Sequence, residues 1–218
     1  MSGRVLALAL RAPHSAAPRR VEALAALAGL GLEGDRHLDS RSPRQVLLVG
    51  SAAYTQLGLA PHTLRENLLL DIDTAGLASG TLLRIGAQAI LRLSFQCEAC
   101  AALELLRPGL VRAVGGRRGI LARVHTGGLI RAGDPVRLLD ERLPALAEDW
   151  RDRVAQVVDA MPPGMVVEYG QLARLAGVQS SYCRAFPRVL ASRGLTGKAV
   201  GAGSGSSAPR WEGAGLFE

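Results

Sequence analysis

The sequence predicts a mixed, two-domain protein in which a β-barrel-like domain precedes a small helical domain. Residues 1–140 contain many short apolar runs separated by turn signals such as ASG and RAGD, which favours a closed or nearly closed β-barrel over alternating βαβ units. The charged, proline-containing segment DERLPALAEDW at 140–150 marks a boundary, and apolar residues after it recur at helical spacing. The predicted ranges are 1–140 for the barrel, 141–148 for a linker, 149–196 for the helical domain and 197–218 for a Gly/Ser-rich tail.

The barrel domain begins with GRVLALAL at 3–10, an alternating run that we expect to form a strand rather than a secretory signal, because no convincing cleavage site follows it. The next run, VEALAALAGL at 21–30, has helical spacing and ends in glycine, so a helix is predicted there. Further strands are predicted at QVLLV (45–49), LLRIG (82–86), AILRLS (89–94), GILARV (119–124) and PVRLL (135–139).

The helical domain opens with DWRDRVAQVVDAM at 149–161, where apolar residues recur at i, i+3, i+4 and i+7 before a Pro-Pro-Gly stop. A short extended piece, MVVEY, leads into a second helix at QLARLAGV, and Ser180 or Ser181 is expected to cap a third helix, SYCRAFPRVLASR. Three short helices with a turn between the last two predict a helix-turn-helix. The tail from Gly197 is predicted to be mobile, with three residues able to dock its end: Trp211, Leu216 and Phe217.

The composition favours an anionic partner. Hydrophobic residues make up 48% of the chain, but no apolar run reaches the roughly 18–20 residues that cross a bilayer, so no membrane partner is expected. The formal net charge is +7, and Lys198 is the only lysine among the cations. Arginine binds phosphate and carboxylate bidentately, which fits a phosphorylated cofactor, nucleic acid or both, whereas a coding bias that replaces Lys by Arg is the alternative explanation. Without a lysine, the barrel domain cannot form the Schiff base of a pyridoxal phosphate enzyme.

Two of the three cysteines, Cys97 and Cys100, lie three positions apart in SFQCEACAALELL. An odd number of cysteines, two of them too close to staple a fold, fits a reducing cytoplasm. The pair has four interpretations: a redox couple, half of a zinc site, a metal ligand or persulfide carrier with a neighbour, or two buried thiols. Zinc is disfavoured because Cys183 and the four histidines form no second ligand pair, and a redox couple because the βαβ context is missing, although a helix can begin at Ala101.

Several segments, taken in order, resemble a MOSC domain, which is named for the C-terminal domain of molybdenum-cofactor sulfurase. The resemblance covers about residues 3–140 and rests on these segments: GLEGDRH (31–37), RQVLLV (44–49), LRENLLL (64–70), CEAC (97–100), ARV (122–124) and GGLIRAGDPV (127–136). It implies a β-barrel-like fold that holds molybdenum cofactor (molybdopterin) or carries sulfur. The His-Gly-Gly segment of many cofactor-binding members is replaced here by HLDSRSPRQV, as in small bacterial members with LRENL and CxxC, so the ligand pocket is expected to differ.

The resemblance also implies roles for individual residues. Cys100 matches the molybdenum ligand of the family, so it is the predicted metal ligand or catalytic persulfide carrier, with Cys97 as its helper. The predicted cofactor-binding residues are Arg36, Arg44, Asn67, Arg123, Gly127 and Gly128. Three acidic residues either orient these arginines or close loops by hydrogen bonds: Glu33, Asp35 and Glu66. His37 is a candidate titrating group near the site, and Gly31 and Gly34 are expected in turns.

The helical domain resembles the winged-helix-like DNA-binding domain of alkylguanine-DNA alkyltransferases and alkyltransferase-like proteins. The resemblance spans about residues 150–193 and implies DNA contacts by three residues: Tyr169, Arg184 and Arg188. The Pro-Cys-His-Arg segment of that family is absent after Ser192, so alkyl transfer to cysteine is excluded, and Cys183 is no substitute. Pro187 is expected to kink or end the recognition helix, which leaves a degenerate module that covers the barrel, dimerises or recruits a protein as the alternative.

Three functions follow from these features. The first is a molybdenum-dependent reductase of N-hydroxylated compounds or bases, which requires an electron donor protein. The second is a sulfur carrier that a cysteine desulfurase loads. The third is a non-enzymatic protein that binds DNA or DNA lesions through the helical domain. The substrate and the oligomeric state stay open.

Overall fold

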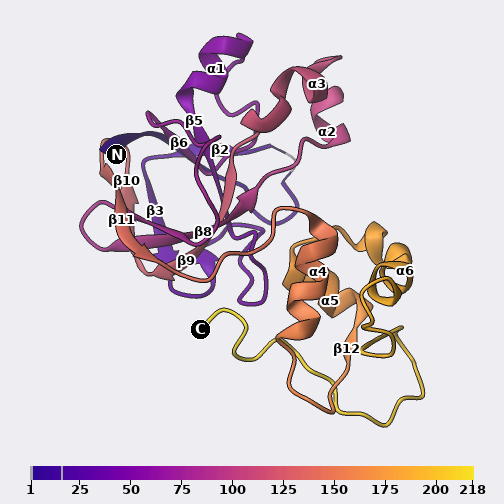
Figure 1. The fold of residues 1–218 in the computed structure, drawn as a ribbon. Coiled ribbons are helices and arrows are strands. Elements are labelled where there is room, and N and C mark those ends of the chain that lie inside the picture. The colour runs from indigo at the N-terminus through magenta and orange to yellow at the C-terminus, as the bar shows by residue number, and fades with distance from the viewer. Residues whose placement is uncertain (1, 16) are drawn as a thin grey trace. The chain divides into compact units, whose positions relative to one another are not determined.

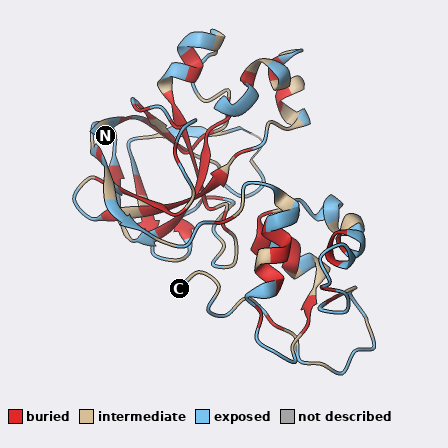
Figure 2. Cartoon of the chain, viewed as in Figure 1, coloured by how far each residue is buried: buried red, intermediate tan, exposed pale blue. Residues whose placement is uncertain are grey.

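The computed structural model describes residues 2–15 and 17–218 and divides into two compact units. The first comprises residues 1–40 and 44–145, and the second comprises residues 41–43 and 146–218 (Figure 1). Each unit has its own apolar core, which Figure 2 shows as red segments along the strands of the first unit and the helices of the second. Among the described residues, no helix has the length and apolar character that a bilayer crossing requires.

The first unit is built on a closed ring of strands, as the turn-separated apolar runs predicted. In the described part of the chain the ring has this order: β11 (Pro135–Arg142), β7 (Thr81–Ile85), β8 (Ala89–Gln96), β9 (Ile120–Thr126), β5 (Val46–Gly50), β6 (Leu68–Leu70) and β1 (Ser2–Leu10), with β1 pairing back to β11. Its neighbours are antiparallel except β5 and β6, which are parallel. Closure pairs each of these strands on both sides and leaves no open sheet edge in the ring.

The helix predicted at 21–30 is wrong, because this segment forms strands. β2 (Arg19–Val21) pairs with β1, and β3 (Ala23–Leu27) lies between β4 (Gly31–Leu32) and β10 (Gly128–Arg131) in a small antiparallel sheet. Along β3 the side chains alternate, so that Leu24 and Ala26 are buried while their neighbours are more exposed. Leucine and alanine have high helix propensity, but pairing with two strands outweighs that preference.

Short helices connect the strands of the barrel. α1 (Ser51–Leu57) follows β5 directly, and a longer excursion between β8 and β9 contains α2 (Ala101–Glu104), α3 (Leu110–Val114) and the 3-10 turn η1 (Gly115–Arg117). The helix onset expected at Ala101 is confirmed, with Cys100 at the N-cap position of α2. The Glu104 carboxylate accepts hydrogen bonds from the backbone N–H groups of Gly109 and Val111, both at 2.8 Å, and so closes the turn between α2 and α3.

The second unit is mainly helical. Its elements are α4 (Trp150–Asp159), β12 (Val167–Glu168), α5 (Tyr169–Ala176), η2 (Ser180–Ala185), α6 (Phe186–Ala191) and β13 (Ala199–Val200). The helix predicted at 149–161 is confirmed, and Asp149 caps it by accepting a 2.7 Å hydrogen bond from the backbone N–H of Arg151. The strands β12 and β13 pair in parallel, so residues of the predicted tail belong to the folded unit.

The third helix is split, as Pro187 predicted. The segment forms the 3-10 helix η2 and then α6, with Pro187 in the first turn of α6, where its missing N–H is not needed. The predicted serine cap is wrong, because Gln179 occupies the N-cap position of η2 and makes no side-chain capping hydrogen bond. α6 has 6 residues, or about 9 Å of helix at 1.5 Å per residue, so a continuous recognition helix is not formed.

The end of the tail packs on the second unit. Trp211 is 3% exposed and belongs to the core, and Leu216 and Phe217 pack against that core. The backbone N–H of Trp211 donates to the carbonyl of Val166 at 2.8 Å, and its indole Nε1–H donates to the carbonyl of Ala214 at 3.2 Å. The aromatic and aliphatic residues at the end of the chain therefore dock despite the Gly/Ser-rich stretch before them.

Candidate functional site

The barrel unit contains a small cavity of about 70 Å³ whose wall is rich in arginine. The lining residues are Arg11, His37, Arg44, Leu47, Arg65, Asn67, Cys97, Arg118 and Leu121. They come from the residue after β1, the 37–44 loop, the strand β5, the segment before β6, and the point where β8 ends and β9 begins. Four cationic side chains around so small a space make it a candidate anion site.

Cys97 and Arg118 lie 21 positions apart in the chain but meet at the end of one antiparallel ladder. β8 and β9 pair as far as Gln96 and Ile120, and beyond them the backbone N–H of Cys97 donates to the carbonyl of Gly119 at 2.8 Å. Gly119 has φ +100°, and a Cβ there would lie 2.3 Å from the carbonyl oxygen of Leu48. Only glycine permits this close crossing over β5, which fixes the backbone next to Arg118.

Arg118 is the most exceptional group in the cavity. Its side chain is 5% exposed, and neither Nε nor Nη1 has a hydrogen-bond partner within the described chain. Burying an unpaired charge is energetically unfavourable, because the interior does not replace the lost hydration. The Nε of Arg11 is likewise buried without a partner. A bound anion would satisfy these donors.

Neighbouring positive charges destabilise the charged form of the lining arginine Arg11. Burial, together with the positive charges of Arg65 and Arg36, lowers the pKa of Arg11 to about 10, although Asp35 opposes this shift. Arg11 therefore stays charged at neutral pH in an environment that disfavours its charge. A negative ligand would reverse this repulsion.

Asp35 organises one side of the cavity. Its Oδ1 accepts hydrogen bonds from the backbone N–H of His37 at 2.9 Å and from Nδ1 of the same residue at 3.0 Å. Its Oδ2 accepts from the backbone N–H of Arg11 at 3.0 Å and from Nδ2 of Asn67 at 2.9 Å. Burial alone would raise the pKa of Asp35, but the hydrogen bonds from His37 and Arg11 outweigh it and lower the pKa. The carboxylate is therefore an ionised anchor for its neighbours.

His37 links this anchor to a lining arginine. Its Nδ1 faces the Asp35 carboxylate, and its Nε2 lies 2.9 Å from Nη2 of Arg11. A proton on Nδ1 and a lone pair on Nε2 satisfy both contacts, so the geometry selects that neutral tautomer. Asp35 thus holds the Arg11 guanidinium through His37.

Asn67 lines the cavity, but its side-chain amide is already hydrogen-bonded to other groups of the protein. Nδ2 donates to Asp35 and, at 3.2 Å, to the carbonyl of Ala9, while Oδ1 accepts from the backbone N–H of Leu47 at 3.1 Å. Both amide protons are therefore occupied. The structure places this predicted cofactor-binding residue at the site as a support that joins β1, β5 and the Asp35 loop.

The LRENL segment holds an unusual backbone beside the cavity. His62 and Arg65 have φ of +62° and +60°, a left-handed conformation that costs about 1–3 kcal/mol for residues other than glycine. Glu66 is fully buried and accepts a hydrogen bond from the Tyr54 hydroxyl, and its Oε1 lies 3.1 Å from Nδ1 of His62. Burial and the adjacent carboxylate raise the pKa of Tyr54. The observed partners of Glu66 thus correspond to its loop-closing alternative.

The two cysteines of the CEAC motif face different surroundings. Cys97 is 8% exposed and lines the cavity, where its Sγ lies 3.8 Å from the carbonyl oxygen of Glu98. Cys100 is half-buried at the N-cap of α2 and is not among the lining residues. Within residues 2–15 and 17–218, His, Cys, Asp and Glu form no group of three that could hold a metal ion. A metal at this cavity would therefore need ligands of its own besides the protein thiol.

The other predicted cofactor-binding residues are distributed unevenly. Arg44 lines the cavity, whereas Arg36 is exposed and is not a lining residue, although its backbone N–H donates to the carbonyl of Arg11 at 2.8 Å. Arg123 is 8% exposed and donates to the carbonyls of Ser40 at 3.0 Å and Gly29 at 3.3 Å, so it supports a loop. Burial is the main cause that lowers its pKa to about 10.

Gly127 and Gly128 stand at the junction of β9 and β10, away from the cavity lining. A Cβ at Gly127 would lie 2.9 Å from the carbonyl oxygen of Ala26, and one at Gly128 would lie 2.9 Å from the backbone nitrogen of Ala89. Close backbone packing explains both glycines. Sequence reasoning missed Arg11, Arg65 and Arg118, of which only Arg65 stands in a matched motif, LRENLLL.

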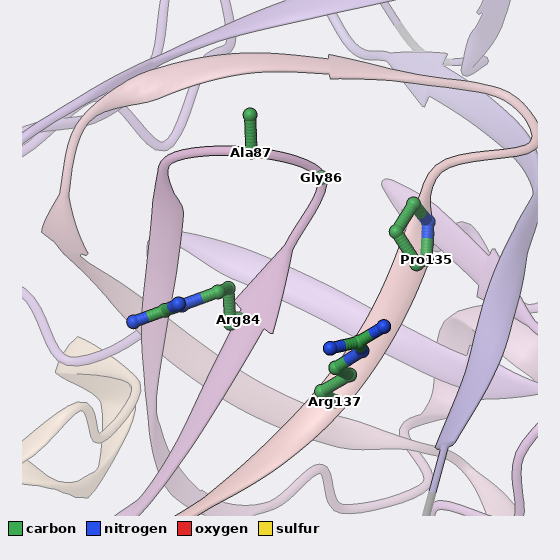
Figure 3. Close-up of a pocket in the computed structure, with 5 residues that line it drawn as sticks. All are labelled: Arg84, Gly86, Ala87, Pro135 and Arg137. Carbon is green, nitrogen blue, oxygen red and sulfur yellow. The ribbon is translucent and has the colours of Figure 1, made fainter.

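A second hollow of about 220 Å³ lies on the outside of the barrel, at the turn between β7 and β8. Arg84 and Arg137 are paired across β7 and β11, and Figure 3 shows the Arg84 side chain pointing away from Arg137, with the Gly86 turn and Pro135 further along the two strands. Both arginines are exposed. Solvent therefore hydrates their charges, and the smaller buried cavity is the better candidate site.

The residues predicted to contact DNA also differ in exposure. Tyr169 is half-buried and packs edge-on against Phe186, with ring centroids 6.1 Å apart, so it lies against the core of the second unit. Arg184 is exposed on η2, and Arg188 is exposed on α6. Burial raises the pKa of the Cys183 thiol, which lies 3.4 Å from the carbonyl oxygen of Tyr169.

Comparison with known proteins bears on the first unit. Residues 37–137 match the family model described as the MOSC domain, which supports the predicted MOSC barrel. This match does not reach residues 150–193, where the alkyltransferase resemblance stays a prediction. No curated protein matches the sequence.

Solved structures show the same fold at low identity. YuaD from Bacillus subtilis has a TM-score of 0.56 and 19% identity, over 63% of this chain and 96% of that one. YiiM from Geobacillus stearothermophilus has a TM-score of 0.55 and 17% identity, over 86% of this chain and 99% of that one. YiiM from Escherichia coli has a TM-score of 0.51 and 20% identity, over 87% of this chain and 94% of that one. At these identities the likeness is one of fold alone.

Proposed function

We propose that the barrel unit acts as a MOSC-type domain that holds the anionic, metal-bearing part of molybdenum cofactor in the arginine-lined cavity, with the Cys97 thiolate facing the metal. The observation that carries the proposal is the buried Arg118 guanidinium, two of whose nitrogens lack partners, next to a nearly buried thiol in the same cavity wall. A thiolate is a soft ligand suited to such a metal, and a guanidinium binds phosphate or oxo groups.

The donor set fits this cofactor in kind. Arg11, Arg44, Arg65 and Arg118 would hold its anionic groups, and Cys97 would supply the protein's sulfur ligand. A cavity of about 70 Å³ is well below the roughly 300–1,000 Å³ of small-molecule pockets, so it would take one end of the cofactor rather than the whole ring system. In this proposal Cys97 replaces Cys100 as the principal cysteine, because only Cys97 lines the cavity.

The reaction proposed is the reduction of an N-hydroxylated compound or base. When bound, molybdenum cofactor supplies two-electron redox chemistry. The N–O bond breaks, and two electrons and two protons convert the hydroxylamine to an amine and water. The electrons come from a separate electron donor protein. The protein's own contribution is to bind and orient, because Asp35 fixes Arg11 and His37 at the cavity wall.

The test is metal and pterin analysis of protein purified from a host that makes molybdenum cofactor. We expect near-stoichiometric molybdenum in the wild type, its loss in Cys97→Ser and Arg118→Gln, and its retention in Cys100→Ser. Retention in Cys97→Ser with loss in Cys100→Ser would return the ligand role to Cys100. Wild-type protein without molybdenum and pterin would reject cofactor binding.

A sulfur-carrier function is the second candidate, favoured by a second thiol three residues from Cys97 at the N-cap of α2. In this reaction a persulfide on a cysteine desulfurase gives its terminal sulfur to the Cys97 thiolate, and the desulfurase thiol is released. Mass spectrometry after incubation with desulfurase and cysteine should show one added sulfur on Cys97, and none in Cys97→Ser. An unmodified wild-type protein would exclude this candidate.

A further inference from the structure

The second unit has a hollow of about 400 Å³ that the proposed function does not use. It lies between the first turn of α4 and the helix α6, and its lining residues are Trp150, Arg151, Ala185, Arg188, Val189 and Ser192. Its volume is within the range of small-molecule pockets, roughly 300–1,000 Å³. An aromatic ring, two guanidiniums and a hydroxyl in one wall indicate a ligand that is both planar and anionic.

The aromatic part of the hollow is held in place by other rings. Trp150 is half-buried, and its ring centroid lies 5.0 Å from that of Tyr182, at an interplanar angle of 71°, and 6.3 Å from that of Phe186, at 37°. Phe186 is fully buried, whereas Tyr182 is 37% exposed and supports the Trp150 ring without lining the hollow. Such packing fixes the indole orientation before a ligand arrives, which reduces the entropy lost on stacking.

The cationic part consists of Arg151 and Arg188. The Arg151 guanidinium lies 4.6 Å from the Trp150 ring centroid, in a cation–π contact, and its Nη1 is 3.5 Å from the Asp149 carboxylate. Another nearby carboxylate, Asp152, pairs with Arg193. Across the described residues Arg188 makes no ion pair and is exposed, so its charge is available to a ligand.

Ser192 completes the polar edge of the hollow. Its hydroxyl donates to the carbonyl of Val189 at 2.8 Å, so its oxygen keeps lone pairs that can accept a hydrogen bond. An amine or ring N–H of a ligand would find an acceptor there. The hollow therefore offers stacking, anion pairing and an acceptor within one small surface.

We propose that this hollow binds a phosphorylated nucleobase, with the base stacked against Trp150 and the phosphate paired with Arg188 and Arg151. Base–aromatic stacking combined with guanidinium contacts to phosphate is the physical basis of single-strand nucleotide recognition. The ligand is a free nucleotide or an unpaired nucleotide of a strand, and both share this chemistry.

The structure favours an unpaired base over docking of a helix into duplex DNA. Pro187 begins α6 instead of extending a recognition helix, and Tyr169 packs against Phe186 in the core. A duplex hides its base faces by stacking, whereas an unpaired nucleotide exposes one to the indole.

The experiment uses the full-length protein and four probes: AMP, a fluorescently labelled single-stranded DNA oligonucleotide, the same sequence as a duplex, and inorganic phosphate. Binding of nucleotide to the hollow should quench Trp150 fluorescence, while Trp211, 3% exposed, serves as an internal reference. Fluorescence anisotropy with the labelled strand gives an independent affinity.

The variants separate the hollow from general charge. Arg188→Gln should weaken binding of the single strand roughly tenfold, since a charge-assisted hydrogen bond is lost. Arg184→Gln is the matched control, because Arg184 is exposed on η2 but does not line the hollow, and its effect should stay below about twofold. Trp150→Phe should abolish the quench and weaken binding several-fold, because a smaller ring stacks less well. Circular dichroism checks that each variant is folded.

The outcomes decide the proposal. Tighter binding of the strand than of AMP identifies a strand as the source of the nucleotide, and equal binding identifies the free nucleotide. Phosphate binding as tightly as AMP would overturn the proposal, because the base would then contribute nothing. The proposal would also be overturned if the duplex bound as tightly as the single strand and Arg184→Gln weakened binding as much as Arg188→Gln. Absence of binding to all four probes would overturn it as well.

Discussion

In the barrel cavity the Arg118 side chain is 5% exposed and two of its nitrogens lack partners, whereas Arg188 in the second unit lies in water on α6. The first charge is held at high energy by the fold, because Gly119 fixes the adjacent backbone and burial removes hydration. The second charge has low energy without a ligand and is screened by salt. The fold therefore fixes one arginine in place before an anion binds and leaves another free to adapt to its ligand.

The largest effect should come from removing the anchor of the buried site. Asp35→Asn leaves Arg11 and its cationic neighbours without the carboxylate that accepts four hydrogen bonds, so we expect a loss of about 3–5 kcal/mol in the free energy of unfolding. Urea denaturation measures this loss. Asp140→Asn, an exposed site on β11, is the control and should change stability by less than about 0.5 kcal/mol. Equal stability of the two variants would show that Asp35 does not anchor the wall of the cavity.

Replacing the buried cation should have the opposite sign. Arg118→Met removes an unpaired buried charge while keeping an unbranched side chain, so the anion-free protein should become more stable by about 1–3 kcal/mol. The same variant should lose the rise in melting temperature that added phosphate or molybdate gives the wild type. Thermal unfolding with and without the anion tests both halves. A destabilised variant that still responds to anion would show that Arg118 is not the binding group.

The pH dependence of stability should be smaller and should follow Asp35. Its pKa is lowered in the folded state, relative to about 3.9 in an unfolded chain, so its stabilisation is present above that value and is lost as pH falls through the folded pKa. Unfolding free energies measured between neutral pH and acid should therefore fall below about pH 4. In Asp35→Asn this part of the acid dependence should be missing, and an unchanged acid profile would contradict the assignment.

The smallest stability effect is expected at the exposed site. Arg188→Gln should change the free energy of unfolding by less than about 0.5 kcal/mol, because the side chain is solvated and makes no ion pair among the described residues. Its binding effect should shrink as salt rises, whereas anion binding at Arg118 should be less sensitive to salt. Titrations at low and high ionic strength compare the two. The same dependence on salt at both sites would show that Arg118 and Arg188 are screened by solvent to the same extent.

The strands and the resemblance to the MOSC domain were accessible from the sequence because their signals are local. Alternating runs such as residues 3–10 predicted strands, and the ordered motifs predicted a MOSC barrel for the region that the family match supports. The segment 21–30 failed because leucine and alanine suit a helix as well as a buried strand, and only its pairing with β4 and β10 decides between them.

The candidate site was only partly accessible for a different reason. Arg11 follows the end of β1 and Arg118 precedes the start of β9, and the sheet order β9, β5, β6, β1 brings these distant parts of the sequence together. No spacing rule predicts that Cys97, which extends the β8 ladder, faces the cavity while Cys100 caps a helix. Asn67 was found by its motif, but its hydrogen bonds show that it supports the wall.

The bond between Cys97 and Gly119 has a consequence for how this architecture can diversify. Because that bond fixes both ends of the connection that carries α2 and α3, the segment 98–117 can change in length and sequence without moving its ends. Doubling its length would cost only about 0.6 kcal/mol in chain entropy, and the thiol and the guanidinium would keep their places. Changes in this connection could therefore alter which ligands reach the cavity, while the residues of the cavity wall stay in place.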